Sequence, residues 1–399
     1  MIHKIENFKK IQYLVGNKNF KINSKNPFDK IICDFVSELS VNLNQNLKTK
    51  NYPDVKTFAF WCRKQNILNL KNRYTSNSLR LGHGLIFHIT PSNIPTNFAY
   101  SLMFGLLNGN SNIVKVPSKK FEQVKIICDG LKKILKKNKY IPLRGMISII
   151  RYKNDEVTKE ISLLSDVRLI WGGDNSIKNI RKFNLKQRAI DIAFADRFSF
   201  CIIDSKSILK LKKIELNTLI QKFYNDTYLV DQNACSSPHL IIWTGQEILK
   251  AKKIFWNNLY KHVKKKYNFP EIASMDKYSK LIENLLSLKN IKKFYMYDNL
   301  IYVLSLKNLD DGVDLLRGKW GYFYEYNMND LNKISKFVNK KFQTLTYFGL
   351  TKKYLTKFVL DNNLRGIDRI VPIGQALDIS FEWDGYDLNK ILSRVIDLK

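Results

Sequence analysis

The segment LIFHITPSNIPTNFAYSLMFGLLNGNSNIVKV, residues 85–116, decides the fold because two short apolar runs enclose a helical pattern. The runs LIFHI (85–89) and NIVKV (112–116) are rich in β-branched residues, which is typical of buried strands. Between them, apolar side chains recur at helical spacing on a face formed by Phe98, Leu102, Gly105 and Leu106. A strand, a helix and a second strand predict a parallel β-α-β unit with a right-handed crossover.

The same alternation continues along the chain. Strands are expected at 146–150, 167–171 and 198–203, and helices at 119–137 and after Asn154 or Asp155. This pattern predicts an α/β fold with a Rossmann-like parallel sheet. Residues 1–80 give a weaker and mostly helical pattern.

The regular alternation of predicted strands and helices ends near residue 230. HLIIW predicts a strand, residues 246–267 and 276–290 predict helices, and 294–306 predict a hairpin. We therefore expect a second α/β domain. The predicted divisions are an N-terminal helical region with a cofactor domain (1–227), a catalytic domain (228–362) and a returning C-terminal segment (363–399).

Composition favours a folded, soluble protein. Hydrophobic residues make up 45% of the 399 residues and aromatic residues 13%, which is sufficient for packed cores. No stretch reaches the roughly 18 consecutive apolar residues of a membrane span. The N-terminus has no secretion signal pattern, so we expect a cytoplasmic protein.

The formal net charge of +32 raises the possibility of a nucleic-acid partner. The lysines, however, are spread along the chain at helix-like spacing, and no nucleic-acid-binding motif is found. A basic surface without a specific nucleic acid is the favoured interpretation, although such a surface steers anionic ligands.

Five cysteines are scattered without paired spacing, which argues against a zinc site or a disulfide framework. Cys128 and Cys201 lie among apolar residues and are expected in the core. Cys235 differs, because it lies in DQNACSSPH (231–239) among small and polar residues. It is the candidate nucleophile.

Three turns follow predicted strands, where doubly wound sheets bind ligands: TPSNIP, VPSKK and WGGDNS. None matches GxGxxG, and each turn alone is common. Their order and spacing, together with DQNACSSP, resemble the aldehyde dehydrogenase superfamily. With ADRFSFCIID and the closing VPIGQALDISFEWDGYDL, the chain resembles the LuxC-type acyl-CoA reductase family from about residue 80 onward.

The resemblance implies an NADPH-dependent reductase that converts an acyl thioester into an aldehyde through an acyl-cysteine. Cys235 would be the nucleophile, and Asn93 with the backbone N–H of Cys235 would stabilise the oxyanion. A helix N-cap is the alternative role of Asn93. For the cofactor, the resemblance implies contacts from Thr90, Pro91, Lys115, Ser118, Gly172 and Gly173, with Ser118 near a 2′-phosphate.

Two departures from the superfamily matter. The general-base Glu of hydrolytic members is absent from AFADRFSF, which fits a reductase. Asp191 or Asp196 lies nearby, and Asp196 paired with Arg197 is the structural alternative. Asp174 in WGGDNS would repel a pyrophosphate unless it turns away, and Lys178 is placed to compensate.

Several other polar residues have less defined roles. His83, His88 and His239 are expected to be structural, and no role is assigned to Gln343 and Thr344. The resemblance further implies an acyl-CoA or acyl-protein substrate, an acyl-activating partner protein and a homo-oligomer. The competing hypotheses are an oxidising aldehyde dehydrogenase, a cysteine-dependent acyltransferase or thioesterase, and a basic nucleic-acid-binding protein.

Overall fold

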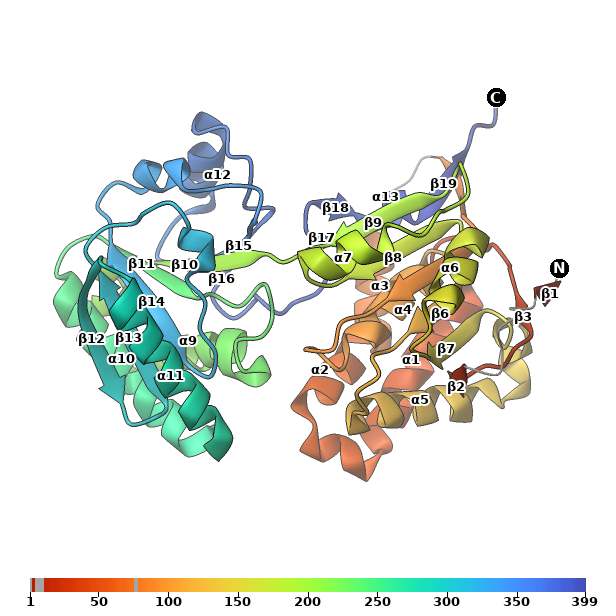
Figure 1. Ribbon diagram of the computed structural model, residues 1–399, viewed down its shortest axis with the longest axis horizontal. Coiled ribbons are helices and arrows are strands. Elements are labelled where there is room, and N and C mark those ends of the chain that lie inside the picture. Colours follow the sequence, from red (N-terminus) through yellow and green to blue (C-terminus); the bar gives the residue numbers. More distant parts are fainter. Residues whose placement is uncertain (1, 4–10, 75–77) are drawn as a thin grey trace. The chain divides into compact units, whose positions relative to one another are not determined.

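The computed structural model describes residues 2–3, 11–74 and 78–399 and divides the chain into two compact units. The first unit comprises Met1–Asp196 and Ser380–Lys399, and the second comprises Arg197–Ile379 (Figure 1). Both units are α/β, as predicted. Among the described helices, none is long and apolar enough to cross a membrane.

The first unit is built on a six-stranded sheet with the order β2-β7-β6-β5-β8-β9. Five strands are parallel, and β2 pairs antiparallel with β7. The strands are β2 (Gln12–Val15), β5 (Leu85–Ile89), β6 (Ser111–Lys115), β7 (Ile147–Arg151), β8 (Val167–Trp171) and β9 (Ile190–Phe194). The strands predicted at 85–89, 112–116, 146–150 and 167–171 are thereby confirmed.

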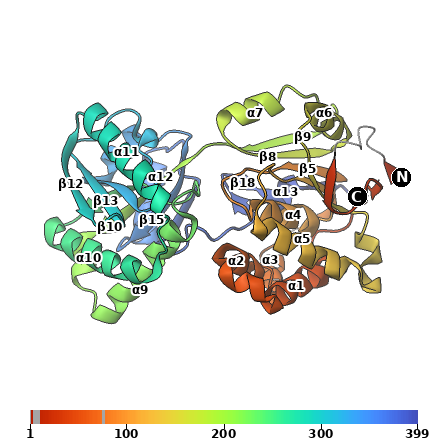
Figure 2. The ribbon, with the colours of Figure 1, turned by 60° about the horizontal axis from the view of Figure 1, so that its bottom comes forward.

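Helices cover both faces of this sheet. Figure 2 shows α6 and α7 on one face, and α4 and α5 with α1–α3 on the other. The helices are α1 (Lys30–Gln45), α2 (Pro53–Trp61), α3 (Lys64–Arg73), α4 (Asn97–Leu107), α5 (Glu122–Leu135), α6 (Asp155–Leu164) and α7 (Asp174–Ile180). Helix α4 is buried on all sides, because it packs between strands β5 and β6 and helix α1.

The C-terminal residues return to the first unit. Strand β19 (Ser393–Ile396) pairs antiparallel with β4 (Leu79–Gly82), and β17 (Glu382–Trp383) pairs with β18 (Tyr386–Asp387) ahead of α13 (Leu388–Ile391). The short strands β1 (Ile2–His3) and β3 (Phe20–Lys21) form a further pair. The return begins at residue 380, whereas the sequence suggested 363, since strand β16 (Arg369–Pro372) belongs to the second unit.

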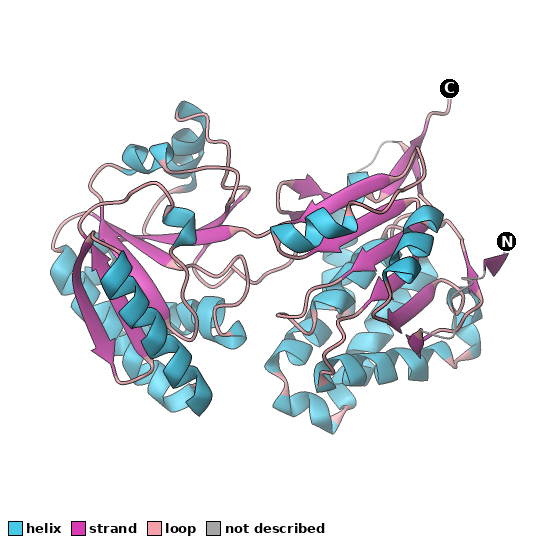
Figure 3. Cartoon of the chain, viewed as in Figure 1, coloured by secondary structure: helices cyan, strands magenta, loops and turns pink. Residues whose placement is uncertain are grey.

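The second unit contains a seven-stranded sheet with the order β12-β13-β14-β11-β10-β15-β16. Figure 3 draws the strands in magenta and the helices in cyan. All neighbours are parallel except the predicted hairpin of β12 and β13. The strands are β10 (Phe198–Asp204), β11 (Leu240–Thr244), β12 (Ile291–Tyr297), β13 (Ile301–Leu306), β14 (Tyr322–Asn327), β15 (Phe342–Phe348) and β16 (Arg369–Pro372).

Strand β10 corrects one prediction. The run 198–203 was expected to continue the first series of strands, but β10 lies between β11 and β15 in the second sheet. The compact units consequently divide after Asp196, whereas the sequence suggested a division after residue 227. A buried strand looks the same in either sheet, because its apolar run does not encode its pairing partners.

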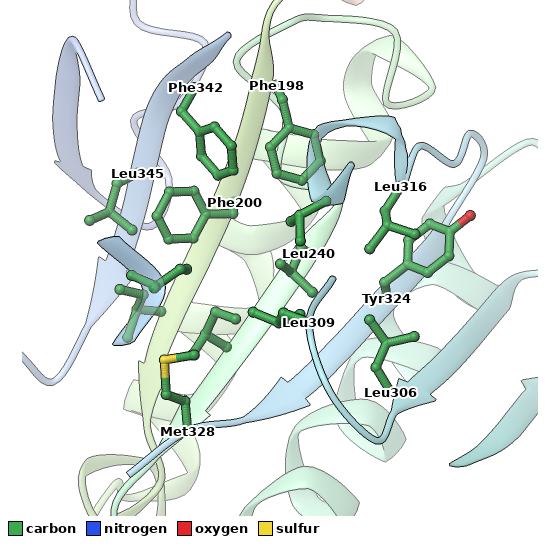
Figure 4. Close-up of a cluster of buried hydrophobic side chains, with 14 of the residues drawn as sticks. Phe198, Phe200, Leu240, Leu306, Leu309, Leu316, Tyr324, Met328, Phe342 and Leu345 are labelled. Atoms are coloured by element: carbon green, nitrogen blue, oxygen red, sulfur yellow. The ribbon is translucent and has the colours of Figure 1, made fainter. Parts of the chain in front are cut away.

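Two cores flank the second sheet. One face packs against α8 (Ser205–Leu209), α9 (Lys213–Thr227) and α10 (Ile248–Lys266). The other face packs against α11 (Glu271–Ser287) and α12 (Lys352–Asp361). Figure 4 shows part of this second core, in which the Phe342 ring of β15 packs edge-on against Phe198 and Phe200 of β10 and Leu345 belongs to the same cluster. Short 3-10 helices complete the fold: η2 (Leu47–Asn51), η3 (Asn138–Leu143), η4 (Tyr228–Val230), η5 (Val313–Leu315) and η6 (Leu331–Lys336).

Candidate active site

In the first sheet, the direction of the crossovers reverses at β5. The chain proceeds from β5 to β6 and β7 on one side and then returns to β8 on the other side of β5. Parallel sheets bind ligands beyond the carboxyl ends of the strands at such a switch point. The three turns quoted above follow the carboxyl ends of β5, β6 and β8, where Thr90, Lys115 and Gly172 lie.

Thr90 and Lys115 are directly connected. The backbone N–H and the hydroxyl of Thr90 both donate to the Lys115 carbonyl, at 3.2 and 2.8 Å. The Lys115 ammonium lies 4.7 Å from the centroid of the Tyr152 ring. Burial lowers the pKa of Lys115, and nearby Asp155 opposes this shift. Lys115 is half-buried at the end of β6, whereas Ser118, three residues later, is exposed.

The loop after β5 places Pro91 half-buried and Asn93 exposed. Helix α4 begins at Asn97, and Thr96 occupies the N-cap position. The alternative interpretation of Asn93 as the N-cap of this helix is therefore wrong.

Gly172 and Gly173 follow β8 and precede α7. A Cβ atom on Gly173 would meet nothing within 4 Å, so the backbone there is open to a ligand. Asp174 and Lys178 on α7 are both exposed.

The acidic residues near β9 have different environments. Asp191 accepts hydrogen bonds from buried Arg168 at 3.1 Å and from Arg181 at 3.0 Å, so its role is structural. Asp196 is exposed at the end of the first unit. Arg197 donates to Asp368 of the second unit.

Cys235 lies in the second unit, in the loop 231–239 that leads into β11. Its side chain is half-buried between buried neighbours Ala234 and Ser236. The Ser199 hydroxyl of β10 donates to the Cys235 carbonyl at 2.6 Å and accepts from the Thr344 N–H of β15 at 3.1 Å. The cysteine loop is thus fixed at the amino ends of three neighbouring strands, β11, β10 and β15.

Gln343 contacts the Cys235 sulfur, and sequence reasoning did not predict this contact. Its side-chain amide donates to the Cys235 sulfur at 3.6 Å, and its oxygen accepts from the Thr344 hydroxyl at 3.4 Å. The side chain is 2% exposed. A polar pair at the start of the apolar run FQTLTY was the available signal, but nothing local linked it to Cys235.

His83, His88 and His239, which were expected to be structural, all have hydrogen-bond partners within the fold. His239 accepts the Gly318 N–H on Nδ1 and stacks on Phe198. Burial, assisted by the Arg317 charge, lowers the pKa of His239 to about 3, so the ring is neutral. His83 donates to the Ile391 carbonyl at 3.0 Å, and His88 is held between Ser101 and Asn112.

Cys128 and Cys201 are buried, as predicted, and so is Cys62. Burial raises the pKa of each of these three thiols. Cys33 is half-buried, and burial also raises its pKa. In the part of the chain that the structure describes, no group of three or more His, Cys, Asp or Glu is placed to hold a metal ion.

The structure thus assembles two sets of candidate residues. Thr90, Lys115 and the glycine pair share one end of the first sheet, whereas Cys235, Gln343 and Ser199 share one end of the second. Asn93 belongs to the first unit and Cys235 to the second.

Comparisons with known proteins agree with this architecture. A family model described as "Acyl-CoA reductase (LuxC)" matches residues 63–394. The long-chain acyl-protein thioester reductase of Aliivibrio fischeri is 24% identical over 305 residues, which cover 73% of this chain and 58% of that protein. The chain therefore spans little more than half the length of this relative.

Solved structures show the fold. Aldehyde dehydrogenase 21 from Physcomitrella patens is similar with a TM-score of 0.63 at 11% identity, covering 92% of this chain and 85% of that chain. A 1-pyrroline-5-carboxylate dehydrogenase from Thermus thermophilus gives a TM-score of 0.62 at 9% identity, covering 91% and 80%. The chain has the aldehyde dehydrogenase fold, as predicted.

Proposed function

Because the chain belongs to the acyl-CoA reductase (LuxC) family, we propose that it reduces an acyl thioester to an aldehyde with NADPH, through an acyl group held on Cys235. The observation that carries the proposal is the setting of Cys235. Its sulfur is half-buried in a loop fixed by Ser199 and accepts a hydrogen bond from the Gln343 amide. An amide N–H directed at sulfur stabilises negative charge on it, as a nucleophile requires.

The reaction begins when the Cys235 thiolate attacks the carbonyl carbon of the thioester. The bond from this carbon to the departing sulfur breaks, the leaving group departs as a thiolate that takes a proton from solvent, and an acyl-cysteine remains. When bound, NADPH supplies the hydride that this carbon accepts. The resulting tetrahedral oxyanion then re-forms the carbonyl and expels the Cys235 thiolate, releasing the aldehyde. A thiolate is suited to both steps because it attacks and leaves readily.

Negative charge develops on the carbonyl oxygen in both steps and requires fixed hydrogen-bond donors. We assign these donors to the Asn93 amide and the backbone N–H of Cys235. The exposure of Asn93 supports this assignment. The position of Thr96, rather than Asn93, as the cap of α4 supports it as well.

The cofactor is assigned to the switch point of the first sheet. Lys115 would contact the adenosine ribose, Ser118 the 2′-phosphate, and Thr90, Pro91, Gly172 and Gly173 would line the site. The residues fit a nucleotide, because a half-buried lysine and an open glycine backbone lie at the carboxyl ends of β6 and β8, on either side of β5. We propose reduction rather than hydrolysis because AFADRFSF lacks a glutamate and Asp191 is engaged by two arginines.

The substrate is an acyl-CoA or an acyl-protein thioester. The name of the Aliivibrio relative, an acyl-protein thioester reductase, supports a protein-bound acyl donor. We therefore also propose an acyl-activating partner protein and a homo-oligomer.

The decisive experiment measures NADPH oxidation with a panel of acyl-CoAs of increasing chain length, for wild type and Cys235→Ala. We expect Cys235→Ala to lose activity by more than about a thousandfold, because removal of a covalent nucleophile eliminates the main route. Circular dichroism checks that the variant is folded. If the wild type releases free CoA without oxidising NADPH, the protein is an acyltransferase or thioesterase and the proposal is wrong.

A further inference from the structure

Helix α11 buries a lysine that the proposed chemistry does not use. Lys277 is 1% exposed, although lysine is almost never fully buried. Its ammonium donates to the carbonyls of Asn299 and Trp320, at 2.8 and 2.7 Å. It also lies 4.4 Å from the centroid of the Tyr302 ring. Burial pulls the pKa of Lys277 well below its usual range, so the contacts that hold it there must offset a substantial desolvation cost.

Lys277 fixes the segment 317–322, which we call the bridging segment. The Trp320 carbonyl accepts from Lys277, and the Trp320 N–H donates to the Asp231 carbonyl at 3.2 Å. Trp320 has a φ of 55°, a left-handed conformation that is unfavourable for a bulky residue and persists only when its surroundings impose it. The two hydrogen bonds on either side of Trp320 impose it here.

The bridging segment holds both ends of the cysteine loop. At the start of the loop, buried Gln232 accepts the N–H groups of Gly321 and Tyr322 at 2.9 and 3.0 Å. The same side chain donates to the Pro238 carbonyl at 3.2 Å. At the end of the loop, His239 accepts the Gly318 N–H. Asp231 and Gln232 are themselves left-handed, with φ of 53° and 56°.

A continuous set of contacts therefore runs from Lys277 through the bridging segment to both ends of the loop that carries Cys235. We propose that Lys277 is a positioning residue for Cys235: it locks the bridging segment, which in turn fixes the loop so that the sulfur meets the Gln343 amide. This inference rests on the proposed function only in taking Cys235 as the nucleophile.

The test is the rate at which iodoacetamide alkylates Cys235, followed by peptide mass spectrometry, with Cys33 as the internal standard. Lys277→Met keeps the length of the side chain and removes its donors. Lys277→Gln retains an amide donor and serves if the Met variant does not fold. Leu281→Val trims the buried face of α11 one turn further on and controls for general loosening of the helix.

We expect at least a threefold lower alkylation rate at neutral pH in Lys277→Met, with Lys277→Gln intermediate. We also expect a higher apparent pKa for alkylation, because the Gln343 contact is weakened, and an unchanged rate in Leu281→Val. A folded Lys277 variant with the wild-type rate and profile would overturn the proposal. So would an equal fall in Leu281→Val. Alkylation needs no cofactor or substrate, so this result is independent of whether the protein oxidises NADPH.

Discussion

His88 is fully buried next to the carboxyl end of β5, and one of its ring nitrogens donates a hydrogen bond while the other accepts one. Its Nε2–H donates to the Asn112 Oδ1 atom at 2.9 Å, and its Nδ1 accepts from the Ser101 hydroxyl at 2.7 Å. Ser101 in turn accepts from the Trp171 indole N–H at 2.9 Å. A neutral imidazole protonated on Nε2 satisfies both partners. Burial accordingly lowers the pKa of His88 to about 4, and the Asn112 contact opposes the shift only partly.

Because the folded and unfolded chains protonate His88 at different pH values, the free energy of unfolding depends on pH. The unfolded chain binds a proton at His88 below about pH 6.5, whereas the folded chain does so only below about pH 4. Its contribution to the free energy of unfolding is therefore present above pH 6.5 and is lost as the pH falls toward 4. We expect the stability advantage of wild type over His88→Gln to shrink by about 2 kcal/mol from pH 8 to pH 5. Urea denaturation at several pH values measures the free energy of unfolding of both proteins. A difference between wild type and His88→Gln that stays the same from pH 8 to pH 5 would contradict the prediction.

At the scale of elements, helix α4 approaches β6 closely at Gly105. A Cβ atom there would lie 1.8 Å from the Asn112 Oδ1 atom and 3.1 Å from the His88 Nε2 atom. In an unobstructed helix, replacing Gly by Ala stabilises by about 1 kcal/mol. We expect Gly105→Ala instead to destabilise by about 3 kcal/mol, because it separates helix from strand and breaks a buried hydrogen-bond network.

A double-mutant cycle with Asn112→Ala is the control for this prediction. Removing the Asn112 amide also removes the obstructing oxygen, so the cost of Gly105→Ala should fall sharply in that background. Thermal unfolding of the four proteins gives the coupling free energy. Equal costs in both backgrounds would show that the contact between helix and strand does not limit stability at Gly105.

The elements differ in how far sequence alone could predict them. The segment 85–116 was predictable because a β-α-β unit is encoded in local apolar periodicity. The position of β10 in the second sheet could not be predicted, because its pairing with β11 and β15 depends on segments far away in the chain. The same limit applies to the candidate site. Cys235 was recognisable from its small and polar neighbours, but the contact from Gln343, 108 residues away, required the structure.

At the scale of the whole molecule, the candidate functions are divided between the units. The residues assigned to the cofactor belong to the first unit, and the nucleophile belongs to the second. Attack on a thioester by Cys235 precedes hydride transfer in the proposed reaction. The division therefore predicts that acylation and cofactor binding can be impaired separately.

We expect Lys115→Met to weaken NADPH binding by about 10- to 100-fold, the loss of one charge-assisted contact. CoA release in a single turnover without NADPH should be unchanged. Cys235→Ala should show the reverse, with normal NADPH affinity and no CoA release. Fluorescence titration and a thiol assay measure the two quantities, with Lys119→Met as the control because Lys119 is exposed four residues along the same loop. If Lys115→Met bound NADPH normally but lost CoA release, the cofactor would lie elsewhere. A residue that contacts only the bound nucleotide should affect NADPH binding and leave the acylation of Cys235 unchanged.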